Sequence, residues 1–314
     1  MRRAFIGVFD SGVGGLTVVR ELRALLPNER ILYLGDTARV PYGNKSKETV
    51  QRYAYEALQF LSTVGSELKE REGQVSGASR PPPFEGRDLP LKLVVVACNT
   101  VSAVALEGLR QRISVPVIGV IQPAARLAVQ STKNSKVGVI GTRGTIRSGV
   151  YQEVLRHLDP GIEVGVQACP LLVPLAEEGW LQHPVTDLTL ETYLGTFKVG
   201  GFDTLVLGCT HYPLLEPAIQ KLLGNEVHLI NSAKSTAQES ALLLQKRGWL
   251  AKSMIQGSNE ESMPRGELLC FVTDTPQRFR EIAHHFLGEP PESVEQVELS
   301  GFVGGMEESH SVRA

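Results

Sequence analysis

The sequence predicts an α/β protein made of two pseudo-symmetric parallel-sheet domains, with the active site in the cleft between them. Short aliphatic and β-branched runs alternate with amphipathic segments of helical length, which is the pattern of βαβ units. Two of the runs, VVVACNT at 94–100 and LVLGCTHYP at 205–213, each end in a cysteine followed by small polar residues. A weak internal repeat relates the two parts of the chain that contain these runs.

Continuous apolar runs of this kind indicate strands buried on both faces, as in a parallel sheet. We expect strands over 4–9, 30–35, 93–97, 115–120, 136–140, 162–168, 203–208, 227–230, 268–273 and 294–299. We expect helices between them, over 15–26, 47–63, 101–112, 123–131, 145–158, 183–197, 214–223, 234–247 and 276–287. Pro123 suits a first helical position, and Thr145 is the expected cap of the helix that begins after Gly144.

The internal repeat pairs FIGVFDSGVGG at 5–15 with KVGVIGTRGT at 136–145. Each segment has the pattern of a strand, a glycine-rich polar turn and the start of a helix. We therefore expect a discontinuous first α/β domain and a second α/β domain inserted in it. The boundaries that we predict are 1–122 with 235–299 for the first domain, and 123–234 for the second.

Two stretches are too polar or too broken to belong to a core. Residues 66–90 contain four prolines, three glycines and nine charged residues, and we expect them to form a surface insertion. Residues 300–314 are rich in glycine and polar residues and are expected to form a disordered tail.

Composition excludes several classes of protein. The chain has 314 residues, is 42% hydrophobic and carries a net charge of −2, so no general attraction to nucleic acid or an anionic membrane is expected. No apolar stretch approaches the length of a membrane span. The four cysteines form no CxxC pair, which argues against a zinc ribbon or a disulfide framework and for a reduced, cytoplasmic protein without a metal site.

Cys98 and Cys209 stand at predicted strand ends, where ligands collect in open parallel sheets. Two facing thiols suit proton exchange on opposite faces of one carbon. A thiolate removes a proton, a thiol on the other side delivers one, and the stereocentre inverts. Free cysteine has a pKa of about 8.5, so neighbouring groups must favour the thiolate.

The residues around each thiol can supply that help. Asn99 and Thr100 follow one cysteine, and Thr210 and His211 follow the other, at positions where helices open. Asp10, at the end of the first strand, is a candidate relay or base for one thiol, and His211 for the other.

Other polar residues and thiols are expected to lie outside the chemistry. Cys169 and Cys270 lack polar followers and are predicted to be buried structural residues. We expect Asp36 to cap a turn and Glu177 to lie outside the site. Four histidines are expected on solvated helix faces: His157, His183, His284 and His285.

The motifs together resemble the glutamate racemases of the cofactor-independent aspartate/glutamate racemase superfamily. The resemblance runs in order from about residue 4 to about residue 298. It is carried by FDSGVGGLTV (9–18), YLGDTARVPYGNKS (33–46), VVACNTVSA (95–103), PVIGVIQPA (116–124), GVIGTRGTI (138–146), CPLLVPLAEEG (169–179) and LVLGCTHYPLL (205–215).

The resemblance implies interconversion of L- and D-glutamate for peptidoglycan, with no pyridoxal phosphate or metal. It implies that Cys98 takes the α-proton from D-glutamate and Cys209 takes it from L-glutamate. It also implies a cytoplasmic homodimer with glutamate as its small-molecule partner. The residues expected to hold the amino acid are Asp10, Ser11, Tyr42, Gly43, Asn99, Thr100, Thr210 and His211.

Two other classes of function stay open on the sequence. One is a different enzyme on the same scaffold, such as an aspartate racemase or a maleate-isomerase-like enzyme with one nucleophilic cysteine. Relatives that act on aspartate commonly carry Glu where this chain has His211, which favours glutamate. The other is a binding module whose two-lobed cleft closes on a small ligand without reaction.

Overall fold

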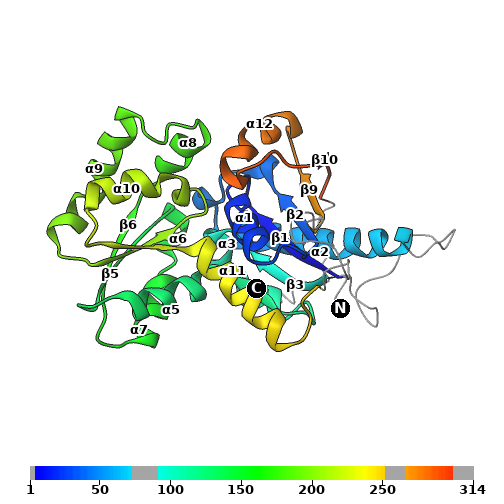
Figure 1. The fold of residues 1–314 in the computed structure, drawn as a ribbon, viewed down its shortest axis with the longest axis horizontal. Coiled ribbons are helices and arrows are strands. Elements are labelled where there is room, and N and C mark those ends of the chain that lie inside the picture. Colours follow the sequence, from blue (N-terminus) through cyan, green and yellow to red (C-terminus); the bar gives the residue numbers. More distant parts are fainter. Residues whose placement is uncertain (1–3, 73–90, 252–265, 300–314) are drawn as a thin grey trace, which may run out of the picture.

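Most strands of this chain are buried segments rich in aliphatic residues, and they assemble into two parallel sheets with helices on both faces (Figure 1). The computed structural model describes residues 4–72, 91–251 and 266–299. The expected α/β class is confirmed, and each expected strand is present within a few residues of its predicted bounds.

The larger sheet has six strands in the order β10-β9-β2-β1-β3-β4, all parallel. Its central strands β1 and β3 are buried along their whole length. The strand bounds are β1 (Phe5–Asp10), β2 (Ile31–Gly35), β3 (Leu91–Val96), β4 (Val117–Gly119), β9 (Leu268–Val272) and β10 (Val294–Gln296).

The smaller sheet has four strands in the order β6-β5-β7-β8, also parallel. This order repeats β2-β1-β3-β4 of the larger sheet, so β5 stands where β1 stands and β7 where β3 stands. The internal repeat seen in the sequence is therefore a repeat of topology. The bounds are β5 (Lys136–Gly141), β6 (Glu163–Ala168), β7 (Thr204–Gly208) and β8 (His228–Asn231).

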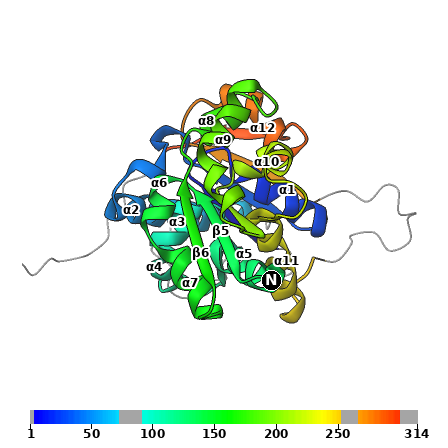
Figure 2. The ribbon, with the colours of Figure 1, turned by 90° about the vertical axis from the view of Figure 1, so that its left-hand side faces the viewer.

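Helices cover both faces of each sheet, and Figure 2 shows α9 and α10 on one side of β5 and β6 with α5 and α7 on the other. The helices are α1 (Leu16–Leu25), α2 (Lys47–Glu72), α3 (Asn99–Val104), α4 (Leu106–Arg110), α5 (Ile121–Ser131), α6 (Arg143–Arg147), α7 (Val150–Leu158), α8 (Leu172–Glu177), α9 (Pro184–Val199), α10 (Glu216–Leu223), α11 (Ser232–Lys246) and α12 (Pro276–Leu287). Short 3₁₀ turns are η1 (Thr37–Arg39), η2 (Tyr42–Asn44) and η3 (Tyr212–Leu215).

One apolar cluster joins the two sheets. It contains Val8 of β1 and Val139 of β5, together with side chains of α1, α5 and α11 that pack between the sheets. Because the burial of apolar surface is the main favourable term in folding, this shared core holds the two sheets in a fixed relation. The strand ends that carry the cysteines therefore face each other from a common support.

Several helix boundaries differ from the expectation. The helix predicted over 145–158 is two helices, because Gly149 adopts a left-handed φ of 75° between α6 and α7. Its cap is Thr142, whose Oγ1 accepts from the Thr145 N–H at 3.2 Å, so the assignment of the cap to Thr145 was wrong. Pro123 is the third residue of α5 and not the first.

Other differences concern element length and number. The helix predicted over 101–112 begins at Asn99 and breaks at Ala105 into α3 and α4. Helix α2 continues to Glu72, so the expected insertion at 66–90 begins as helix, while 73–90 lie outside the described residues, as do 300–314. Helix α8 was not predicted. None of the helices in the described ranges is long and apolar enough to cross a membrane.

Candidate functional site

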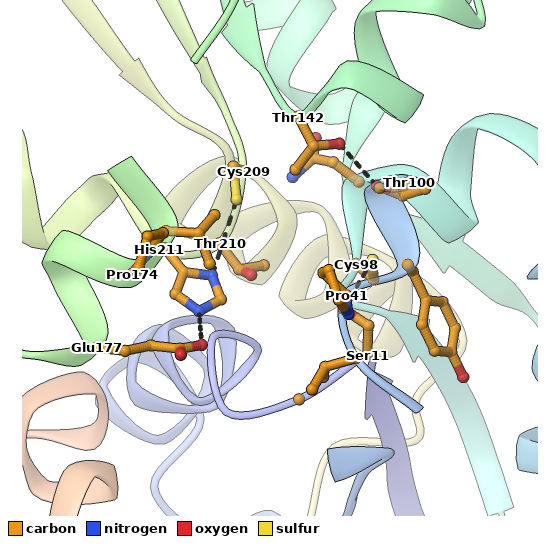
Figure 3. A pocket seen from close by; sticks show the side chains of 16 residues that line it. Ser11, Pro41, Cys98, Thr100, Thr142, Pro174, Glu177, Cys209, Thr210 and His211 are labelled. Carbon is orange, nitrogen blue, oxygen red and sulfur yellow. Dashed lines mark hydrogen bonds and ion pairs between the residues drawn. The ribbon is translucent and has the colours of Figure 1, made fainter. Parts of the chain in front are cut away.

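A pocket of about 320 Å³ opens at the carboxyl ends of four strands (Figure 3). Ser11 follows β1, Cys98 follows β3, Thr142 follows β5 and Cys209 follows β7, and all four line the pocket. The two sheets thus contribute equivalent strand ends to one cavity. This size is at the lower end for ligand pockets in proteins, which suits a small molecule.

The two thiols lie on opposite sides of the pocket (Figure 3), each only 6% exposed. The Cys98 thiol donates a hydrogen bond to Ser11 Oγ at 3.5 Å. Burial raises the pKa of Cys98 to about 12, and the charge of Asp10 adds to this, while Ser11 and the Val101 N–H oppose the rise. Burial and the charge of Asp10 thus favour the neutral thiol of Cys98.

Cys209 has an ionisable partner of a different kind. Its Sγ lies 3.8 Å from Nδ1 of His211, and Nε2 of the same ring lies 2.8 Å from Oε1 of Glu177. Burial alone would lower the pKa of His211, but its hydrogen bonds and charge interactions with Cys209 and Glu177 outweigh burial and raise that pKa to about 10. The imidazole is therefore positively charged at neutral pH beside the Cys209 sulfur.

Glu177 enters the site from α8 and lines the pocket, so the expectation that it lies outside the site was wrong. Burial acts to raise its pKa, but the hydrogen bond and charge of His211 outweigh burial, and the net effect lowers it. Glu177 stays ionised and holds the imidazolium in place. Only a proline-containing helix of six residues places it there, and no periodic pattern marks so short a helix.

Asp10 lies behind the pocket wall and does not line the cavity, although its charge reaches both sides of the site. Its Oδ2 accepts from the Gly12 N–H at 3.0 Å, which fixes the turn that carries Ser11. Burial raises the pKa of Asp10, and the charge of His211 is the largest opposing effect. Its observed contacts are those of a residue that shapes the turn.

Asn99 presents a free donor to the pocket. The hydroxyl of Tyr151 donates to its Oδ1 at 2.8 Å, which fixes the orientation of the amide. The Nδ2 atom is buried and has no hydrogen-bond partner among the residues that the structure describes. A buried donor without a partner is costly, so this N–H₂ group indicates a site for a ligand acceptor.

Three threonine hydroxyls meet beside the pocket. Thr100 belongs to the half of the molecule built on the larger sheet, and Thr142 and Thr145 belong to the half built on the smaller sheet. Thr100 Oγ1 lies 3.0 Å from Thr142 Oγ1 and 3.2 Å from Thr145 Oγ1, and the last two are 3.1 Å apart. Thr142 was not among the predicted site residues. The internal repeat could have indicated it, because that repeat places Thr142 where the first half has Ser11.

The 3₁₀ turn η2 forms the outer wall of the pocket through Tyr42 and Gly43. The Tyr42 hydroxyl donates to Oδ2 of buried Asp36, so this hydroxyl is not directed at a ligand. Asp36 also accepts from Thr273 Oγ1 at 2.8 Å and from Arg39 Nε at 2.6 Å. Asp36 thus anchors the wall to the larger sheet, which is more than a turn cap.

Two glycines allow the halves to meet closely at the pocket. A Cβ atom on Gly14 would lie 2.4 Å from Thr210 Oγ1 and 2.5 Å from His211 Nδ1. A Cβ atom on Gly43 would lie 2.8 Å from the Cβ of Thr142. Only glycine, which has no side chain, fits at these distances. The close approach of the second half therefore explains at least one glycine of the FDSGVGG motif.

The remaining predicted residues lie where the sequence placed them. Thr210 and His211 line the pocket together with Ser11, Tyr42, Gly43, Asn99 and Thr100. Cys169 and Cys270 are buried and do not line it. His157, His183, His284 and His285 are exposed on or at the ends of helices. Within the described ranges, no group of three or more His, Cys, Asp or Glu side chains is placed to hold a metal ion.

The chain is similar to known proteins over nearly its whole length. The family model described as Asp/Glu/Hydantoin racemase matches residues 15–240. A glutamate racemase of Geobacter metallireducens is 47% identical over 294 residues, which are 94% of this chain and 96% of that protein. A solved glutamate racemase isoform of Bacillus anthracis has a TM-score of 0.80 and 39% identity, covering 95% of this chain and 99% of its own. A glutamate racemase of Francisella tularensis, solved in complex with D-glutamate, has a TM-score of 0.78 and 33% identity, with coverage of 96% and 100%.

Proposed function

The chain belongs to the Asp/Glu/hydantoin racemase family and is an amino-acid racemase, and we propose that it interconverts L- and D-glutamate through two cysteine bases. The observation that carries the proposal is the pair of thiols, Cys98 and Cys209, on opposite sides of one small pocket (Figure 3). Relatives named glutamate racemase support the choice of substrate.

In the direction from L to D, the Cys209 thiolate removes the α-proton of L-glutamate. The C–H bond breaks, an S–H bond forms, and the electron pair stays on the α-carbon and its carboxylate. Cys98, whose raised pKa favours the neutral thiol, then gives its proton to the opposite face, and D-glutamate results. In the reverse direction Cys98 is the base, and the ammonium group of the bound substrate favours its thiolate.

The imidazolium of His211 is the group that makes Cys209 an effective base. Its Nδ1 lies 3.8 Å from the Cys209 sulfur, and the Glu177 carboxylate on the other side of the ring keeps the positive charge on the imidazole. Charge-assisted hydrogen bonds of this kind are stronger than neutral ones. Asp10, assigned from the sequence as a catalytic residue, would act through the Ser11 turn and through its charge.

The carboxylates of glutamate would be held by neutral donors. None of the described residues that line the pocket is Lys or Arg. Asn99 Nδ2 is a free buried donor, and hydroxyls of Ser11, Thr100 and Thr210 lie around the same cavity. Donors aimed at the α-carboxylate stabilise the charge that develops there when the α-proton leaves.

We also propose a cellular role for the reaction. D-glutamate is the product, and its use in peptidoglycan would make the enzyme part of cell-wall synthesis in the cytoplasm. We also propose that two copies of this chain form a homodimer. No cofactor or metal takes part in the proposed steps, because the two thiols supply both proton transfers.

A substrate-protection experiment tests the proposed function. Iodoacetamide is expected to abolish racemisation of glutamate by alkylating Cys98 and Cys209, and glutamate is expected to slow the alkylation of both. Chelators and carbonyl reagents are expected to leave the activity intact. Peptide mapping identifies the modified thiols, and aspartate serves as the control ligand. Full activity after complete alkylation of both cysteines would contradict the mechanism.

Glu177→Gln tests the charge on His211. The raised pKa of His211 stabilises the fold fully below pH 6.5, and this contribution is lost as the pH rises through about 10. The lowered pKa of Glu177 stabilises the fold above pH 4.5, and this contribution is lost on acidification. The loss of unfolding free energy in Glu177→Gln is therefore expected to be largest between pH 4.5 and 6.5 and to shrink toward pH 10.

The activity of the same variant is expected to fall about tenfold in kcat/KM at neutral pH, as for the loss of one charge-assisted hydrogen bond. Chemical denaturation across the pH range and racemisation rates provide the two measurements. Glu178→Gln, on the neighbouring residue that pairs with exposed Arg278, is the matched control. Equal effects of the two substitutions would contradict the role given to Glu177.

A further inference from the structure

Helix α12 of the first half reaches the acid–base pair of the second half. The ring of Phe286 packs against the ring of His211 in a T-shaped arrangement, with centroids 5.2 Å apart and planes at 82°. Phe286 is fully buried. Helix α12 otherwise packs against α1 and is followed by β10 of the larger sheet. His211, in contrast, follows β7 of the smaller sheet. Figures 1 and 2 both place α12 next to α8, the helix of Glu177.

The orientation of the His211 ring decides whether it can serve Cys209. Its Nδ1 faces Cys209 and its Nε2 faces Glu177, so a flip of the ring would replace both nitrogens with carbons and break both contacts. With both nitrogens engaged, Phe286 meets the carbon atoms or the face of the ring. This contact restricts rotation without competing for a hydrogen bond, and T-shaped aromatic pairs have a preferred geometry.

We propose that Phe286 is a positioning residue that holds the His211 ring in the orientation that serves Cys209. The inference rests on the proposed function of Cys209 as one of the two bases. The charged or titratable groups that act on His211 are Cys209, Glu177 and, from β1, Asp10. A second residue of α12, Arg278, pairs with exposed Glu178, and its charge also helps to lower the pKa of Glu177.

The first half of the molecule therefore controls the acid–base group of the second half. Gly14 approaches the same ring from the turn after β1, and Phe286 approaches it from α12. Any shift of the second half relative to the first would loosen these contacts. Proton transfer by Cys209 therefore depends on the position of the smaller sheet relative to the larger one.

Phe286→Leu tests the proposal, with Phe279→Leu as the matched control. Phe279 lies on the same helix, is also buried, and packs against Tyr33 instead of His211. The first measurement is the NMR titration of the His211 ring. The second is the rate at which iodoacetamide modifies Cys209 relative to Cys98 at pH 7.5, followed by mass spectrometry. The third is the separation of kcat from KM for glutamate racemisation.

In Phe286→Leu we expect the His211 titration to move toward lower pH and the alkylation of Cys209 to slow severalfold relative to Cys98. We expect kcat to fall about tenfold with KM nearly unchanged, as for a small misplacement of a reacting group. Phe279→Leu is expected to leave the His211 titration and the alkylation ratio as in the native protein. If Phe286→Leu does not fold, Phe286→Met fills the same space with a flexible chain and removes the ring.

Two outcomes would overturn the proposal. One is a His211 titration in Phe286→Leu that matches the native protein. The other is an equal change in Phe286→Leu and Phe279→Leu, which would reduce Phe286 to a packing residue. A native protein that does not racemise glutamate would instead contradict the proposed function, and the titration and alkylation ratio would still decide the role of Phe286.

Discussion

Cys98→Ser and Cys209→Ser are each expected to reduce racemisation of glutamate by about 10²- to 10⁴-fold, the usual contribution of a general acid or base. Serine keeps the size and place of the thiol but is a much weaker acid, so its conjugate base is not available at neutral pH. Both sulfurs line the same pocket, and in the proposed mechanism each turnover uses both, one as base and one as acid. Loss of either therefore stops the full reaction.

A one-way reaction separates the two roles. L- and D-glutamate have equal free energies, so kcat/KM for the two directions must fall together in any variant. A 3-chloro derivative of glutamate avoids this, because removal of the α-proton forms a carbon–carbon double bond and expels chloride, with no need for the second thiol. Cys98→Ser should still eliminate chloride from the L-form, and Cys209→Ser from the D-form. Cys270→Ser, at a buried thiol outside the pocket, is the control. Equal losses toward both enantiomers in both variants would contradict the facial assignment.

Gly14→Ala is expected to reduce kcat/KM about 10²-fold, the second-largest effect, although it adds one methyl group to a residue that takes no part in proton transfer. That methyl group would lie 2.4 Å from Thr210 Oγ1 and 2.5 Å from the His211 ring. These distances are too short for atoms in contact, so the segment that carries Cys209 must move away from the first half. A displacement of about 1 Å at reacting groups is enough for a loss of this size.

Gly195→Ala is the matched control for this change. Gly195 lies in α9, and a Cβ atom there would meet no other atom within 4 Å. Alanine is the better helix former, so this variant should keep full activity and gain about 0.4–1 kcal/mol in unfolding free energy. Racemisation rates and thermal unfolding of both variants provide the comparison. Native activity in Gly14→Ala would show that the close approach of the two halves at Gly14 is not needed.

Local patterns were enough to predict the architecture and both thiols. Parallel strands buried on both faces show as uninterrupted apolar runs, and the cysteines stand where those runs end. The repeat between 5–15 and 136–145 gave the relation between the halves, which the shared strand order confirms. Short helices and their caps were predicted less well, because one residue such as Gly149 decides where a helix breaks.

Contacts at the site between residues that lie far apart in the sequence could not be predicted. Glu177 meets a histidine 34 positions away, from a helix of only six residues. Phe286 meets the same ring across 75 positions, from the other half of the molecule. Contacts of this kind depend on how the two sheets pack, and no local pattern in the sequence records that packing. Thr142 is the exception, since the repeat alone places it opposite Ser11.

The proposed mechanism requires that two thiols, Cys98 and Cys209, transfer protons on opposite faces of one carbon, and isotope exchange distinguishes it from one-base alternatives. Pure protein is incubated with L-glutamate in deuterated water, while optical rotation and hydrogen at the α-carbon are followed together. D-glutamate is expected to form with deuterium at its α-carbon, while the L-glutamate recovered early in the reaction is still unlabelled. Racemisation in which the product keeps its original α-hydrogen, or in which L-glutamate gains deuterium as fast as D-glutamate appears, would contradict it.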